Sequence, residues 1–178
     1  MFFEGRPDQM RMVSDYSLQE ASRGYPRVLE FRVIPGERNE GVRLIVNELF
    51  YTSPQALGPL CLGLVPSPDT ADLSPRMRPV EAGPASFVLA DRLAFCRFAY
   101  RETMPPPILE RWTPEWKRSI FPTAVRIEMA PLHPDPSRLQ PMPLTIPVRV
   151  TKQAKDIYED RADDQQPVIQ DQQPVVRY

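Results

Sequence analysis

The chain has 178 residues, of which 42% are hydrophobic, and this is enough for one domain with a hydrophobic core. Its 22 basic and 23 acidic residues give a formal net charge of -1, so no overall field attracts nucleic acid or an anionic membrane. No stretch approaches the roughly 20 apolar residues of a transmembrane helix, and residues 1–7 lack the apolar region of a signal peptide. We therefore expect a soluble chain and no nucleic-acid partner.

Proline is over-represented, because the chain has 23 prolines but only 7 glycines. This is more than twice the usual proline share of about 5%. Proline fixes φ and removes a backbone donor, so it interrupts helices and is confined to loops, strand starts and sheet edges. The composition favours a mainly β fold with an antiparallel sheet. The proline-heavy stretch 54–84 is predicted to form long ordered or semi-ordered loops.

Alternation of apolar and polar residues predicts the strands of the first third of the chain. A short strand is expected at 9–14. Residues 27–34 alternate so that one face carries the apolar side chains of Leu29, Phe31 and Val33. A turn-rich polar connector leads to a further strand at 42–51, and the two strands are predicted to form a hairpin.

Three more strands are expected in the second half of the chain. Residues 93–100 form an aromatic strand, and 123–129 alternate with Val125, Ile127 and Met129 directed inward. The last strand is predicted at 144–151, where Pro147 favours an edge position. A helical turn is expected at 114–119.

The composition changes near the C-terminus. Residues 150–160 favour a helical turn, and the segment beyond them is acidic and repeats the pentapeptide Asp-Gln-Gln-Pro-Val at 164–168 and 171–175. Such a segment buries too little apolar surface to offset its ordering entropy. We therefore predict a β domain at 1–152 and a disordered acidic tail at 153–178. A role of this tail as a tether or docking peptide is the alternative.

Residues suited to catalysis are scarce. The single histidine, His133, lies in a loop, and the sequence has no cluster of His, Cys and carboxylates at metal-ligand spacing. The glycines are too far apart to form a phosphate-binding loop. The sequence therefore predicts no catalytic, cofactor-binding or metal-binding residue, and we expect the protein not to be an enzyme.

The cysteines and tryptophans each leave two interpretations open. In an oxidising compartment Cys61 and Cys96 are able to form a disulfide, and otherwise they are two unpaired buried thiols. Trp112 and Trp116 either pack at the edge of the core or form an interaction surface.

Several strand phrases follow one another in an order typical of a known family. Phe3-Glu4-Gly5 leads to Val13-Ser14, and the strand at 27–34 follows. An aromatic strand at 89–100 ends in Tyr100, and a loop then contains Trp112 and Trp116. The next strand opens with Pro122-Thr123-Ala124-Val125-Arg126 and continues through Ile127. Over residues 1–152 this pattern resembles the periplasmic domain of a J-type minor pseudopilin of the type II secretion system.

The resemblance implies a structural role. Minor pseudopilins of this type join other minor pseudopilins in a complex at the tip of the pseudopilus, which initiates the filament used in protein export. The family fold is α+β, because a long N-terminal helix anchors the protein in the inner membrane and packs on the sheet. This chain lacks that helix, so we expect a periplasmic domain with an uncovered apolar sheet face.

Three other hypotheses remain for the same sequence. A minor pilin of a type IV pilus has a soluble domain of similar design. A stand-alone periplasmic ligand-binding module would instead use a pocket lined by Tyr100, Trp112 and Trp116. An enzyme would depend on His133.

Overall fold

The computed structural model describes residues 2–66, 73–118, 120–133 and 143–149. The predicted tail at 153–178 and the helical turn expected at 150–160 lie outside these ranges. The described part of the chain is mainly β, as predicted, and every paired strand is antiparallel. The strands are β1 Phe3–Gly5, β2 Gln9–Ser17, β3 Ser22–Pro35, β4 Val42–Phe50, β5 Cys61–Pro66, β6 Leu73–Met77, β7 Phe87–Thr103, β8 Glu110–Thr113, β9 Ala124–Pro131 and β10 Leu144–Pro147.

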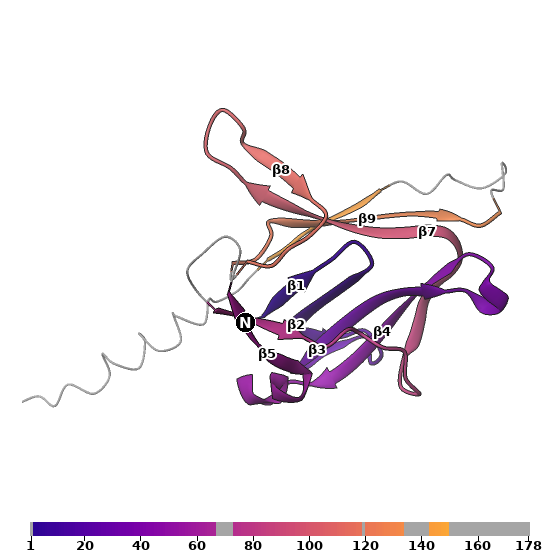
Figure 1. Ribbon diagram of the computed structural model, residues 1–178. Helices are drawn as coiled ribbons and strands as arrows, with labels where there is room; N and C mark the ends of the chain where they lie inside the picture. Colours follow the sequence, from indigo (N-terminus) through magenta and orange to yellow (C-terminus); the bar gives the residue numbers. More distant parts are fainter. Residues whose placement is uncertain (1, 67–72, 119, 134–142, 150–178) are drawn as a thin grey trace, which may run out of the picture. The chain divides into compact units, whose positions relative to one another are not determined.

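One large sheet contains all strands except β5 and β6, in the order β1-β2-β3-β4-β7-β9-β10 (Figure 1). Strand β7 connects its two halves, because its first residues pair with β4 and its later residues pair with β9. The last residues of β7 also pair with β8, which forms a hairpin with it. The sheet curls, so that β1 also lies close to β7.

The predicted hairpin of β3 and β4 is confirmed, with Phe31 opposite Val46 and Val33 opposite Leu44. Its loop contains the short 3-10 helix Glu37–Asn39 and is closed by a hydrogen bond from the Gly36 N–H to the Gly41 carbonyl (2.9 Å). Gly41 has φ +64°, a conformation that glycine adopts without steric cost.

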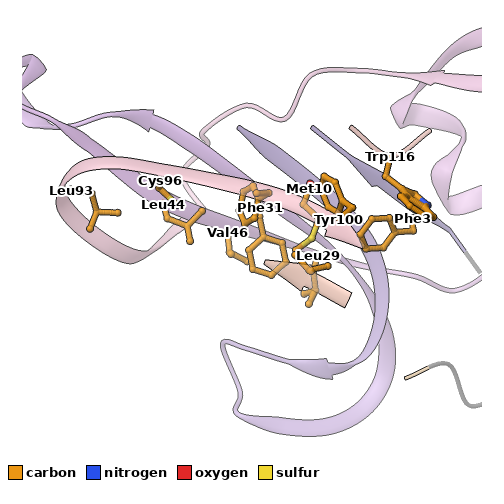
Figure 2. Packing of buried hydrophobic residues seen from close by; sticks show 12 residues of the cluster. Phe3, Met10, Leu29, Phe31, Leu44, Val46, Leu93, Cys96, Tyr100 and Trp116 are labelled. Atoms are coloured by element: carbon orange, nitrogen blue, oxygen red, sulfur yellow. The ribbon is translucent and has the colours of Figure 1, made fainter. Parts of the chain in front are cut away.

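The hydrophobic core lies on one face of the curled sheet. Its buried members are Phe3, Met10, Leu29, Phe31, Leu44, Val46, Leu93, Cys96, Phe98, Tyr100, Trp116 and Val125. Figure 2 shows Leu93, Cys96 and Leu44 at one end of this cluster and the rings of Phe3, Tyr100 and Trp116 at the other. The prediction that Leu29 and Phe31 point into a core is therefore confirmed.

The opposite face of β3 is also buried, although the sequence predicted a half-buried strand. Val28 is 1% exposed and Glu30 is 5% exposed. Arg11 and Asn47, which flank Glu30 in the register, donate hydrogen bonds to the carbonyls of Arg78 and Glu81 at 2.8 and 2.9 Å. The segment 78–81 is therefore held over this second face.

One loop prediction and one helix prediction are wrong for the described residues. Within 54–84, the structure has the 3-10 helix Pro54–Leu60, which contains Pro54 and Pro59, and a two-stranded sheet of β5 and β6. Pro66 ends β5 and Pro75 lies within β6, where a two-stranded sheet leaves each strand an open edge that tolerates proline. The expected helical turn at 114–119 is absent from residues 114–118. Both backbone groups of Trp116 are instead bonded to Gly5.

Candidate interaction surfaces

Trp116 joins two distant parts of the chain at the outer edge of β1. The Gly5 N–H donates to the Trp116 carbonyl (3.0 Å), and the Trp116 N–H donates to the Gly5 carbonyl (2.8 Å). The indole N–H of Trp116 donates to the Ile120 carbonyl (2.7 Å), which fixes the ring although only 2% of the residue is exposed. These bonds satisfy the backbone groups that the edge of β1 would otherwise leave unpaired.

Tyr100 lies directly over Gly5 and is fully buried, with 0% exposure. Its hydroxyl is shared between the carbonyls of Arg6 (2.9 Å) and Gln9 (3.2 Å). The ring of Phe3 meets it edge to face, with centroids 5.7 Å apart. Burial raises the pKa of Tyr100 far above its ordinary value, so this phenol stays protonated and acts as a packing and donor group.

The structure therefore brings together several residues that carry the family resemblance. Phe3, Gly5, Tyr100 and Trp116 form one contiguous cluster (Figure 2). Two further motif residues lie in or beside β9: Val125 is paired with Tyr100, and Pro122 is among the least exposed residues of the chain. The sequence singled out these positions, and their packing explains why the residue types are needed.

The other motif residues lie elsewhere. Val13 is half-buried on β2, and Ile127 is partly buried against the core. Trp112 is half-buried on β8, and the guanidinium carbon of Arg126 lies 3.9 Å from its ring centroid. Because Tyr100 and Trp116 are buried and Arg126 stacks on Trp112, these three aromatic residues do not line an exposed ligand-binding surface.

Both cysteines have free thiols, so the disulfide considered for Cys61 and Cys96 is not formed. Cys96 is buried on β7 in the large sheet, opposite Met129, whereas Cys61 begins β5 in the two-stranded sheet. Burial raises the pKa of the Cys96 thiol to about 11. Cys61 contacts the Gly63 carbonyl through its Sγ at 3.4 Å. The alternative of two unpaired buried thiols is therefore confirmed for Cys96, whereas Cys61 is unpaired but only half-buried.

His133 is exposed, at the end of the described segment that follows β9. Within the described ranges, no group of three or more His, Cys, Asp or Glu residues is arranged to hold a metal ion. Of the helices that the structure describes, none is long and apolar enough to cross a membrane.

A buried ion-pair network on the second face was missed by sequence reasoning. The Arg11 guanidinium, with its side chain 2% exposed, lies 2.6 Å from Glu30 and 3.1 Å from Glu4. Asn47 also donates to Glu30 (3.2 Å) and is bonded to Ser86. The available signal was the charged pair itself, since Arg11 lies between two methionines and Glu30 lies between Leu29 and Phe31. The network holds the segment 78–86 against the sheet.

An uncovered apolar surface continues the core face on the last two strands. The register places Leu144 opposite Ile127 and Ile146 opposite Val125, so these side chains share the face that Phe98 and Tyr100 bury. Leu144 is 52% exposed and Ile146 is 44% exposed. We call the surface of Ile127, Met129, Leu144 and Ile146 the β9–β10 apolar surface.

The free edge of β10 is protected against pairing with another strand. The Val148 N–H donates to the Thr123 carbonyl (3.0 Å). Because the backbone groups of successive residues in a strand point in opposite directions, those of residue 147 point away from β9, to the open edge. This position is Pro147, which has no N–H, and Pro143 precedes the strand. Proline at such positions blunts an edge. We therefore expect a partner to cover the β9–β10 apolar surface and not to add a strand at the edge of β10.

Comparisons with protein-family models, with curated proteins and with solved structures found no match.

Proposed function

We propose that this chain is a structural subunit of the minor pseudopilin type, which joins other pilin-like subunits in the tip complex of a type II secretion or type IV pilus-like machine. The resemblance of residues 1–152 to the J-type domain supports this proposal. The antiparallel sheet, on which the motif residues Phe3, Gly5, Tyr100 and Trp116 pack together, supports it further.

The observation that carries the proposal is the β9–β10 apolar surface. In pseudopilins an amphipathic helix packs on the sheet, and an apolar surface continuous with the core is what such a helix requires. Leu144 and Ile146 extend the core face to the last strand, where about half of each residue is exposed. Covering one such side chain would contribute roughly 1–2 kcal/mol.

A photo-crosslinking experiment tests this assignment. A photoreactive amino acid is placed at Ile146, which is 44% exposed, or at the control position Val88 on β7, which is 47% exposed. The chain is expressed in its source cells and irradiated, and the adducts are identified by mass spectrometry. We expect the Ile146 position to capture an apolar helix of a pilin-like chain, and the Val88 position to give at least fivefold less adduct.

The same cells provide a second measurement, which is independent of any substitution. Membranes are solubilised, the native protein is isolated, and its intact mass and the chains that co-purify with it are determined. Recovery with small pilin-like proteins is expected. Recovery as a species without any such partner, together with equal crosslinking at both positions, would exclude the filament role.

A further inference from the structure

The loop that joins β7 to β8 is an exposed apolar tip. It consists of residues 104–109, with the sequence Met-Pro-Pro-Pro-Ile-Leu, which contains no charged or polar side chain. Ile108 is 58% exposed and Leu109 is 65% exposed. Figure 1 shows this loop at the free end of the β7–β8 hairpin. We call residues 104–109 the proline loop.

Ion pairs hold the base of this hairpin. Arg101 on β7 lies 3.2 Å from Glu110 on β8, and Arg111 lies 2.8 Å from Glu102. Glu102 also pairs with Arg118, and its side chain is 5% exposed. Together with the ladder from Tyr100 to Thr103, these pairs present the loop on an ordered stem, so little entropy is lost when it binds.

We propose that the proline loop inserts shallowly into the surface of a lipid bilayer. The main cost of moving a loop into an apolar medium is the desolvation of its backbone N–H groups. Three of the six residues are prolines and have no such group, and the Met104 N–H is already bonded to the Leu109 carbonyl (3.1 Å). Only Ile108 and Leu109 carry further donors.

The length of the proline loop matches a shallow insertion into the bilayer surface. Thr103 and Glu110 are the last residues of the ladder, and the Met104–Leu109 hydrogen bond continues it by one position, so the tip consists of residues 105–108. Half of this tip extends about 5–7 Å beyond that bond, at roughly 3.3 Å per residue. Interfacial segments bury their apolar faces to a depth of about 5–10 Å, where exposed carbonyl groups keep contact with water and headgroups. The charged stem would remain in the headgroup layer.

Other occupants fit the loop less well. Grooves that recognise proline bind an extended polyproline segment, whereas this loop reverses the chain within six residues. Protein interfaces are anchored mostly by Trp, Tyr and Arg, and the loop offers only aliphatic side chains. The net charge of -1 gives the chain no overall attraction to an anionic surface, so the insertion is expected to depend on the apolar loop. This inference does not rest on the proposed function.

Vesicle flotation tests the inference on the full chain. Phosphatidylcholine vesicles, with and without phosphatidylglycerol, are mixed with the protein and floated through a density gradient. The test variant is Ile108→Ser/Leu109→Ser. The control is Leu62→Ser/Leu64→Ser, because Leu62 and Leu64 on β5 are exposed to nearly the same extent, 55% and 63%.

We expect the loop variant to partition about a hundredfold more weakly, roughly tenfold for each residue, and the control variant to change by less than threefold. Binding should be almost independent of salt and of the phosphatidylglycerol content. A second reporter is Leu109→Trp, whose emission should shift to the blue and be quenched by lipids with brominated acyl chains. This reporter decides the question if the serine variant fails to fold.

Three results would overturn the inference. The first is an unsubstituted chain that does not float with either vesicle. The second is an equal loss in the loop and control variants, or binding that occurs only with anionic lipid and disappears in salt. The third is a concentration-dependent oligomer, observed without lipid, that the loop variant converts to a monomer; the loop would then contact a second copy of the chain.

Discussion

Replacing Gly5 by alanine tests how tightly β1, Tyr100 and Trp116 are packed. A Cβ at this position would lie 2.6 Å from both Cε1 and Cε2 of Tyr100, and still closer to Cζ, whereas ordinary contact is 3.4 to 4 Å. The ring would have to withdraw by about 1 Å to restore normal contact. Gly5→Ala would therefore displace the ring of Tyr100, which is fully buried.

Tyr100 has little room for that movement. Its hydroxyl donates to the carbonyls of Arg6 and Gln9, and the rings of Phe3 and Tyr100 pack edge to face. Overpacking a core costs about 1–3 kcal/mol, and weakening a buried hydrogen bond costs about 1 kcal/mol more. We expect Gly5→Ala to lower the free energy of unfolding by about 3 kcal/mol, a large share of the usual ~5–15 kcal/mol.

Equilibrium unfolding in urea, followed by tryptophan fluorescence, measures this change, since Trp116 lies beside Gly5. The control is Gly24→Ala on β3, where an added Cβ meets nothing within 4 Å; it should change stability by less than about 0.5 kcal/mol. In a Tyr100→Leu background, Gly5→Ala should cost less than half of its value in the parent. Equal effects of the two glycine substitutions, or no coupling with position 100, would refute the proposed contact.

Four further predictions concern buried and edge positions. Arg11→Met should destabilise the fold by about 3–5 kcal/mol in denaturant unfolding, because it leaves the buried Glu30 carboxylate without its cation; Arg11→Met/Glu30→Gln should recover part of this loss, and no recovery would contradict the pairing. Burial raises the pKa of Cys96 from 9.0 to about 11, so the thiol of the unfolded chain ionises at a lower pH than that of the folded chain. The free energy of unfolding should therefore fall as pH rises from about 9 to about 11, and it should fall less in Cys96→Ala. In the folded chain at pH 8, a thiol reagent should modify Cys61 at least a hundredfold faster than Cys96, and equal rates would show that Cys96 is not buried. Pro147→Thr should give the β10 edge an outward N–H and increase self-association in sedimentation velocity, whereas Pro84→Thr in an exposed loop should not.

Local alternation was sufficient to predict much of the large sheet. Strands β4 and β9 were expected close to their observed positions, because each alternates regularly and is bounded by turn residues. The alternating part of β3 was expected as well, but this strand begins at Ser22 and not at Arg27. The edge position of β10 followed from Pro147, since proline cannot donate to a second neighbour. These features depend on a few neighbouring residues and are therefore visible in the sequence.

Features that depend on distant partners were not predictable in this way. Trp116 is extended and not helical because its backbone bonds to Gly5, far away in the chain. Strands β5 and β6 form a second sheet although Pro66 and Pro75 lie within them, because the pairing depends on the partner strand and not on the local sequence alone. The second buried face of β3 exists only because segment 78–81 covers it. The alternation of apolar and polar residues predicts a polar second face on β3, but it does not reveal that another segment of the chain covers this face.

The two exposed apolar surfaces differ in shape and chemistry, and this difference decides which partner each one favours. The β9–β10 apolar surface continues the core on a sheet and ends at an edge that Pro147 keeps from pairing, so its partner must lie flat on the face. A helix has that geometry. The proline loop is a narrow tip on a charged stem, and its side chains cannot be covered by a flat partner. A fluid bilayer closes around such a tip without a shaped pocket, so crosslinking at Ile146 and flotation of the loop variant test two separate interactions.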